Sequence, residues 1–101
     1  MSLTDGASIP AVYADRLRLA EQLGEAICDL VRRNISARDI ITKPTLENAV
    51  KVCLAIGGST NAVLHLAALA YEAELDLDIL NTFAEFSQQT PTITRVYPVL
   101  C

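Results

Sequence analysis

Several residue types that usually carry chemistry are scarce in this sequence. Among its 101 residues there are one histidine, three cysteines and no tryptophan. The cysteines, Cys28, Cys53 and Cys101, form no C-x-x-C pair. Metal sites in proteins are usually made by three or four His, Cys, Asp or Glu side chains at characteristic spacings. The sequence therefore predicts no metal site formed by this chain alone.

Positive charge and long apolar runs are scarce as well. There are 8 Lys and Arg residues against 12 Asp and Glu, so the net charge is -4, and no basic stripe is present to neutralise nucleic-acid phosphates. The longest apolar run is interrupted by His65 and ends at Glu72, too short for a membrane span. The N-terminus lacks the basic start and apolar stretch of a secretion signal. Neither nucleic acid nor membrane is an expected partner, and the cytoplasm is the predicted location.

The residues that are present predict one helical domain. Apolar residues make up 51% and charged residues 20%, which suits a single folded domain over residues 1–101, with a disordered start at 1–7. A first helix is expected from Ala11 to about Arg33, with Ser8 as its cap and Pro10 in its first turn. Gly24 lies on its inner face and predicts close approach of another backbone. The apolar residues expected on that face are Val12, Tyr13, Leu17, Leu19, Ala20, Leu23, Ala26, Ile27, Leu30 and Val31.

A second helix is expected after a short break. Asn34 and Ser36 should end the first helix, and residues 37–41 should form a connector with Ile40 and Ile41 buried. Thr42 should cap the next helix, with Pro44 in its first turn, and Gly57-Gly58 should end it. The residues expected on its inner face are Leu46, Ala49, Val50, Cys53, Leu54 and Gly57.

The third helix is expected to be central to the fold. Residues 62–74 are apolar on nearly all sides, as in a helix buried in a core. Residues 75–80 alternate apolar and acidic, which fits a strand or an extended connector. A short helix should follow over 83–88, capped by Thr82 with Phe83 and Phe86 inward, and residues 92–97 should be extended. The predicted fold class is mainly α, with about four helices.

The turn between the second and third helices is the candidate functional site. Its residues are Gly57, Gly58, Ser59, Thr60 and Asn61. Glycines permit positive φ, and the three polar residues can each cap a helix N-terminus, where free N–H groups favour an anion. The simpler interpretation is an ordinary capped linker, because a lone Gly-rich turn is a weak motif. Binding of a carboxylate or phosphate is the alternative.

For the other residues with reactive side chains we favour structural roles over functional ones. Cys28 and Cys53 lie among apolar residues at helical spacing and are expected to be small core residues. His65, inside the apolar helix, is expected to be a core histidine with a hydrogen-bond partner rather than a site residue. A solvated face explains Asp76 and Asp78 better than a metal pair does, since no third ligand is near. An acid–base pair could otherwise come only from Asp15 and Glu72, and nothing in their sequence neighbourhoods favours that role.

The order and spacing of six segments resemble a known enzyme family. The sequence is similar to the dihydroxy-acid dehydratase / phosphogluconate dehydratase family from about Gly6 to Pro98, most specifically in the decamer that begins at Gly57. The segments that carry the resemblance are Ala7-Ser8-Ile9-Pro10-Ala11, Arg16-Leu17-Arg18-Leu19-Ala20, Asp39-Ile40-Ile41-Thr42, Glu47-Asn48-Ala49, Gly57-Gly58-Ser59-Thr60-Asn61-Ala62-Val63-Leu64-His65-Leu66 and Thr90-Pro91.

The resemblance implies a hydro-lyase that converts a 2,3-dihydroxy acid or sugar acid to a 2-keto acid, as in branched-chain amino acid biosynthesis. It also implies an iron–sulfur cluster and Mg²⁺ in the full-length enzyme. Family members are several times longer. Their cluster motifs, metal ligands and catalytic base are absent here, so no cofactor and no catalytic residue is assigned to this chain. By resemblance, the turn Gly57–Asn61 is a wall of the substrate pocket.

Two hypotheses follow for the chain itself. The first is a segment of such a dehydratase that is inactive alone and buries its apolar helix by self-association or against the rest of the parent enzyme. The alternative is a stand-alone, non-catalytic interaction or anion-binding module derived from the same family. A stop codon shortly after Cys101 in the gene would favour the module, and a reading frame that continues into the downstream family motifs would favour the segment.

Overall fold

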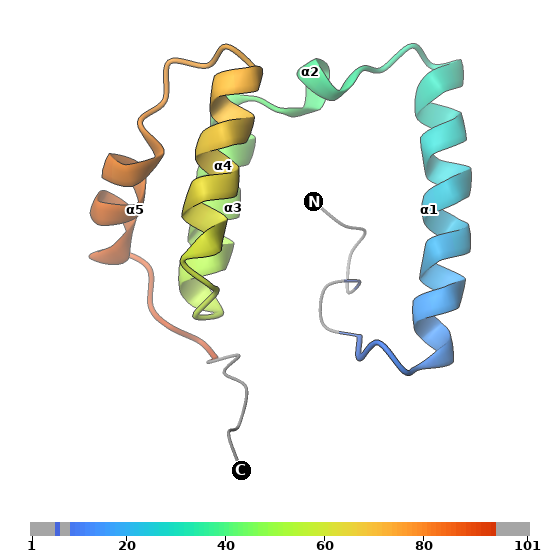
Figure 1. Ribbon diagram of the computed structural model, residues 1–101, viewed down its shortest axis with the longest axis horizontal. Coiled ribbons are helices and arrows are strands. Elements are labelled where there is room, and N and C mark those ends of the chain that lie inside the picture. The colour runs from blue at the N-terminus through green and yellow to red at the C-terminus, as the bar shows by residue number, and fades with distance from the viewer. Residues whose placement is uncertain (1–5, 7–8, 95–101) are drawn as a thin grey trace. The chain divides into compact units, whose positions relative to one another are not determined.

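A computed structural model of the chain describes Gly6 and residues 9–94, and the ribbon in Figure 1 is helical throughout its regular parts. The chain divides into two compact units, residues 1–37 and residues 38–101. The predicted single domain over 1–101 stays a prediction. The predicted disorder at 1–7 falls, apart from Gly6, outside the described residues.

The first unit contains helix α1, Ala14–Arg32. The predicted start at Ala11 is wrong by three residues. Tyr13 has extended backbone, and its N–H donates to the Pro10 carbonyl at 3.1 Å, so the residues before Ala14 form a turn instead of a first helical turn. Asp15 and Arg18 form an ion pair on the outer surface of α1. The expected cap, Ser8, lies outside the described residues.

No residue of α1 is buried. Leu17 is 76% exposed and Val31 is 73% exposed, so their expected burial is wrong for this chain, whereas Leu19, Ala26 and Leu30 of the same predicted face are half-buried. A Cβ placed on Gly24 would meet no atom within 4 Å, so the predicted close backbone approach is not made here either. Within this unit, the Arg16 side chain donates a hydrogen bond to the Gly6 carbonyl at 2.6 Å.

Asn34 ends α1, as predicted. Its φ is 55°, its N–H donates to Val31, and the N–H of Ile35 donates back to Leu30 at 2.9 Å. This pair of hydrogen bonds around a left-handed residue is the Schellman motif. The predicted connector over 37–41 is instead the one-turn helix α2, Ala37–Ile40, which good helix formers such as Ala and Arg favour.

The second unit holds the core. Helices α3 (Lys43–Ala55), α4 (Asn61–Glu72) and α5 (Ile79–Ser87) pack together, with α3 and α4 side by side and α5 against both. The start of α3 is confirmed: Thr42 is its N-cap in a capping box with Thr45, and a proline lies in the first turn. The inner face of α3 is confirmed as well. Within the part of this unit that the structure describes, residues 38–94, the buried residues are Leu46, Val50, Ala70, Ile79 and Thr82.

The connector between α2 and α3 is buried only in part. Ile41 packs against the core as predicted. Ile40 is 39% exposed, so its predicted burial is wrong. Ile40 is the last residue of α2 and Ile41 follows the helix, and of the two only Ile41 packs against the core.

The bounds of the last two helices differ from prediction. Helix α4 ends at Glu72, not Glu74, because Glu74 takes φ 55° and the N–H of Leu75 returns to Ala70 at 3.0 Å. Helix α5 begins four residues before the predicted Phe83. Asp78 is its cap, since its carboxylate accepts from the Asn81 N–H at 3.1 Å. The expected cap, Thr82, is a buried helical residue that donates to the Asp78 carbonyl.

The two segments predicted to be extended contain no strand where the structure describes them. Residues 75–78 form the connector that was the alternative to a strand, and 79–80 belong to α5. Residues 92–94 are irregular, and the N–H groups of Ile93 and Thr94 both donate to the Ala55 carbonyl, at 2.7 and 3.2 Å. Residues 95–97 lie outside the described part. The prediction of a mainly α fold with about four helices is confirmed.

No helix within the described residues is long and apolar enough to cross a membrane. The longest, α1, carries charged residues along its outer side. The apolar helix α4 has only 12 residues, against about 20 for a membrane span.

Candidate functional site

The turn Gly57–Asn61 joins α3 to α4 and is built by the way α3 ends. Gly57 has φ 64°, which an L side chain rarely adopts. Its N–H donates to Leu54 at 3.2 Å, and the Gly58 N–H donates to the Cys53 carbonyl at 2.8 Å. Gly57-Gly58 thus form a Schellman end to α3, which confirms the predicted helix stop.

Gly58 is required by its neighbour across the turn. A Cβ on this residue would lie 2.7 Å from the Cys53 Sγ and 3.3 Å from the Cys53 carbonyl oxygen. The first distance is far below ordinary van der Waals contact. Residue 58 therefore has no room for a side chain while Cys53 keeps its rotamer.

The polar residues of the turn start α4. The Ser59 hydroxyl accepts from the Asn61 N–H at 3.2 Å, and the Ser59 and Thr60 carbonyls accept from Ala62 and Val63 at 2.9 and 3.1 Å. Ser59 is therefore the residue whose side chain satisfies a backbone donor here, while the N–H groups of Ser59 and Thr60 find no acceptor among the described residues. They lie at the N-terminal end of α4, which is the positive end of its dipole.

A small cavity adjoins the turn. Its volume is about 190 Å³, smaller than the several hundred Å³ typical of sites for drug-sized ligands. The side chains of Leu54, Val63 and Phe83 supply apolar walls, and Gly57, Gly58, Ser59 and Thr60 line it on the side of the turn. The structure thus brings four of the five predicted site residues to one cavity. Asn61 does not line it and is exposed.

Cys53 also lines this cavity, and its thiol faces the turn. Burial raises the pKa of the Cys53 thiol above its ordinary value, because desolvation disfavours the thiolate. The prediction that Cys53 packs as a small apolar residue agrees with its half-buried position. The same prediction for Cys28 is wrong, because Cys28 is exposed on α1. Cys101 lies outside the described residues.

His65 is not a core histidine. It is exposed, one turn into α4, and has no hydrogen-bond partner among the described residues. The prediction failed because the described residues of the second unit cover α4 on one side only. Residues that are apolar all round a helix show that both sides are suited to burial, but they do not show that this chain covers both.

The donor groups present do not fit the cofactors that the resemblance implies. Within the described residues, no group of three His, Cys, Asp or Glu side chains is close enough to hold a metal ion. Asp78 is engaged as the cap of α5, and Asp76 is exposed. Cys28 and Cys53 belong to different compact units. Neither an iron–sulfur cluster nor Mg²⁺ is therefore assigned to these residues.

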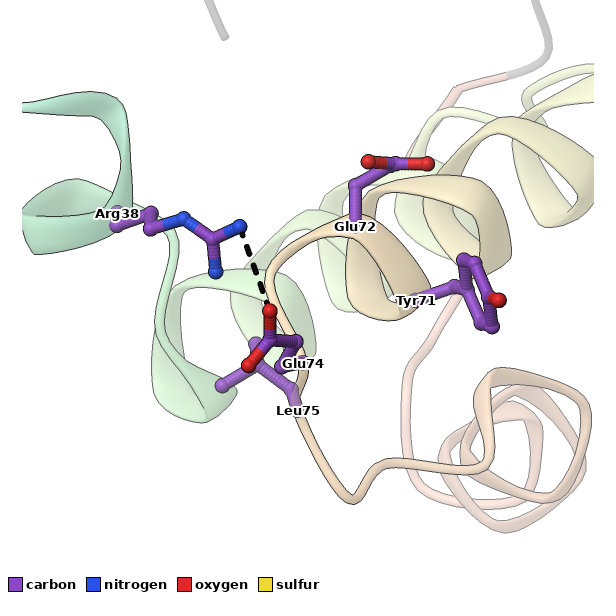
Figure 2. Close-up of a pocket in the computed structure, with 5 residues that line it drawn as sticks. All are labelled: Arg38, Tyr71, Glu72, Glu74 and Leu75. Carbon is purple, nitrogen blue, oxygen red and sulfur yellow. Dashed lines mark ion pairs between the residues drawn. The ribbon is translucent and has the colours of Figure 1, made fainter.

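A second hollow, of about 400 Å³, lies at the C-terminal end of α4. Figure 2 shows Arg38 reaching from α2 toward Glu74, with a nitrogen–oxygen distance of 3.6 Å. Both side chains are mostly exposed, so the pair is weak. Sequence reasoning missed this contact, because it depends on the positive φ of Glu74, and no sequence pattern predicts that conformation for a glutamate.

Comparison with known proteins agrees with the resemblance. The family model described as "Dihydroxy-acid/6-phosphogluconate dehydratase N-terminal" matches residues 1–100. The dihydroxy-acid dehydratase of Methanospirillum hungatei is 52% identical over 98 residues, and that of Methanoregula boonei is 50% identical over 98 residues. The enzyme of Pyrococcus furiosus is 45% identical over the same length.

In each of these comparisons the match covers 97% of this chain and 18% of the relative. The chain thus spans less than a fifth of the length of the relatives it matches. Both the extent of the family match and the level of identity are far above what chance similarity gives. The chain belongs to the dihydroxy-acid/6-phosphogluconate dehydratase family.

Proposed function

We propose that this chain serves as a segment of a dihydroxy-acid or sugar-acid dehydratase, a hydro-lyase that forms a 2-keto acid. The observation that carries the proposal is the identity of about half of all residues with relatives named dihydroxy-acid dehydratase, over 97% of the chain. The cluster and Mg²⁺ of such an enzyme would be held by other parts of the protein. The free thiols of Cys28 and Cys53 suit a reducing compartment, so the proposed location is the cytoplasm.

Within that enzyme, the turn Gly57–Asn61 is proposed to face the substrate. Its support is the pair of N–H groups on Ser59 and Thr60, which have no acceptor among the described residues and adjoin the cavity at Gly58. Two such donors at a helix N-terminus are suited to a carboxylate or phosphate oxygen. The chain alone is expected to have no dehydratase activity. Apolar residues on the outer side of α4 would be covered by the rest of the enzyme or by a second copy.

A chimeric enzyme tests the function. This chain replaces the matching segment of the Methanospirillum hungatei relative, and formation of 2-keto acid from a 2,3-dihydroxy acid is measured. Retained turnover by the chimera, with none by the isolated chain, is the expected result. A folded but inactive chimera, or turnover by the isolated chain, would contradict the proposal.

The role of the turn is tested in the same chimera with a matched pair of variants. Thr60 has φ -58°, a value that proline accepts, so Thr60→Pro removes the N–H with little strain. Thr60→Val removes the hydroxyl and keeps the N–H. We expect Thr60→Pro to raise KM for the acid more than Thr60→Val does. Equal kinetic constants for the two variants would show that the N–H does not meet the substrate.

A further inference from the structure

We draw no further inference here: the strongest candidate, the exposed surface patch on α4 that carries Leu64, His65 and Tyr71, supports no proposal because nothing in the structure shows what covers it.

Discussion

The two compact units of this chain use similar helical sequences with different results. Helix α1 is the longest, with 19 residues, yet none of them is buried. Helices α3, α4 and α5 have 13, 12 and 9 residues, and they enclose Leu46, Val50, Ala70 and Ile79. A helix gains most of its stability from packing of its apolar face, not from its length. The difference shows that an amphipathic pattern identifies a face suited to burial but does not supply its partner.

The largest expected effect is the loss of a core side chain from the second unit. Leu46 is 2% exposed, and Leu46→Ala should lower the free energy of unfolding by about 2–5 kcal/mol. The same change at Leu17 of α1, which is 76% exposed, should cost about 0.5 kcal/mol or less. Urea unfolding followed by circular dichroism measures both. Equal losses would mean that α1 is packed as firmly as α3 in solution, and the comparison between the units would fail.

The next effect contrasts two glycines. Gly58→Ala should destabilise the second unit by about 1–3 kcal/mol, because its Cβ would lie 2.7 Å from the Cys53 Sγ. Gly24→Ala on α1 meets open space and should stabilise the helix by about 0.5–1 kcal/mol. Thermal unfolding of the two variants measures the opposite signs. The double variant Gly58→Ala, Cys53→Ala should recover part of the loss, and failure to do so would place the clash elsewhere.

Helix ends provide a smaller contrast. Glu74 and Asn34 both have φ 55°, but asparagine tolerates this conformation better than glutamate does. Glu74→Gly should therefore stabilise the second unit by about 1 kcal/mol. Loss of its exposed ion pair with Arg38 should offset little of this. Asn34→Gly should change stability less. A larger gain at Asn34, in the same unfolding measurement, would contradict this order.

The smallest effect concerns the two described cysteines. Burial raises the pKa of the Cys53 thiol. A group whose pKa is higher in the folded than in the unfolded protein stabilises the fold below its unfolded pKa, and this stabilisation is lost as the pH rises through the folded pKa. The free energy of unfolding should therefore fall more steeply at alkaline pH for the wild type than for Cys53→Ala. An iodoacetamide reaction should also modify exposed Cys28 before Cys53. Equal pH slopes, or faster modification of Cys53, would show that the thiol is not desolvated.

Local signals were predictable where the responsible residues are close in sequence. The Thr42 cap, the stop at Gly57-Gly58 and the inner face of α3 follow from side chains and glycines within one or two turns. The cap at Asp78 could have been found from its spacing of three residues to Asn81. The Asp78 carboxylate accepts hydrogen bonds from both the backbone N–H and the side-chain amide of Asn81. Glu74 could not, since glutamate rarely takes positive φ.

In the candidate site, too, the feature made by residues close in sequence was predictable and the feature made by distant residues was not. The Gly57–Asn61 turn was identified from its residues, and the cavity beside it was not, because Phe83 and Val63 reach it from α5 and α4. Neither the spacing of Phe83 within its own helix nor that of Val63 indicates which loop they approach.

The sequence by itself determined the helical class, the order of the helices, the Gly-Gly turn and the family. These depend on side-chain periodicity, on φ preferences of single residues and on residue identities. Only the tertiary structure decided that one side of α4 is covered and the other is open, that His65 and Cys28 are exposed, and that Cys53 excludes a side chain at residue 58. Burial depends on which segments meet in space, and that is a property of the whole packed unit.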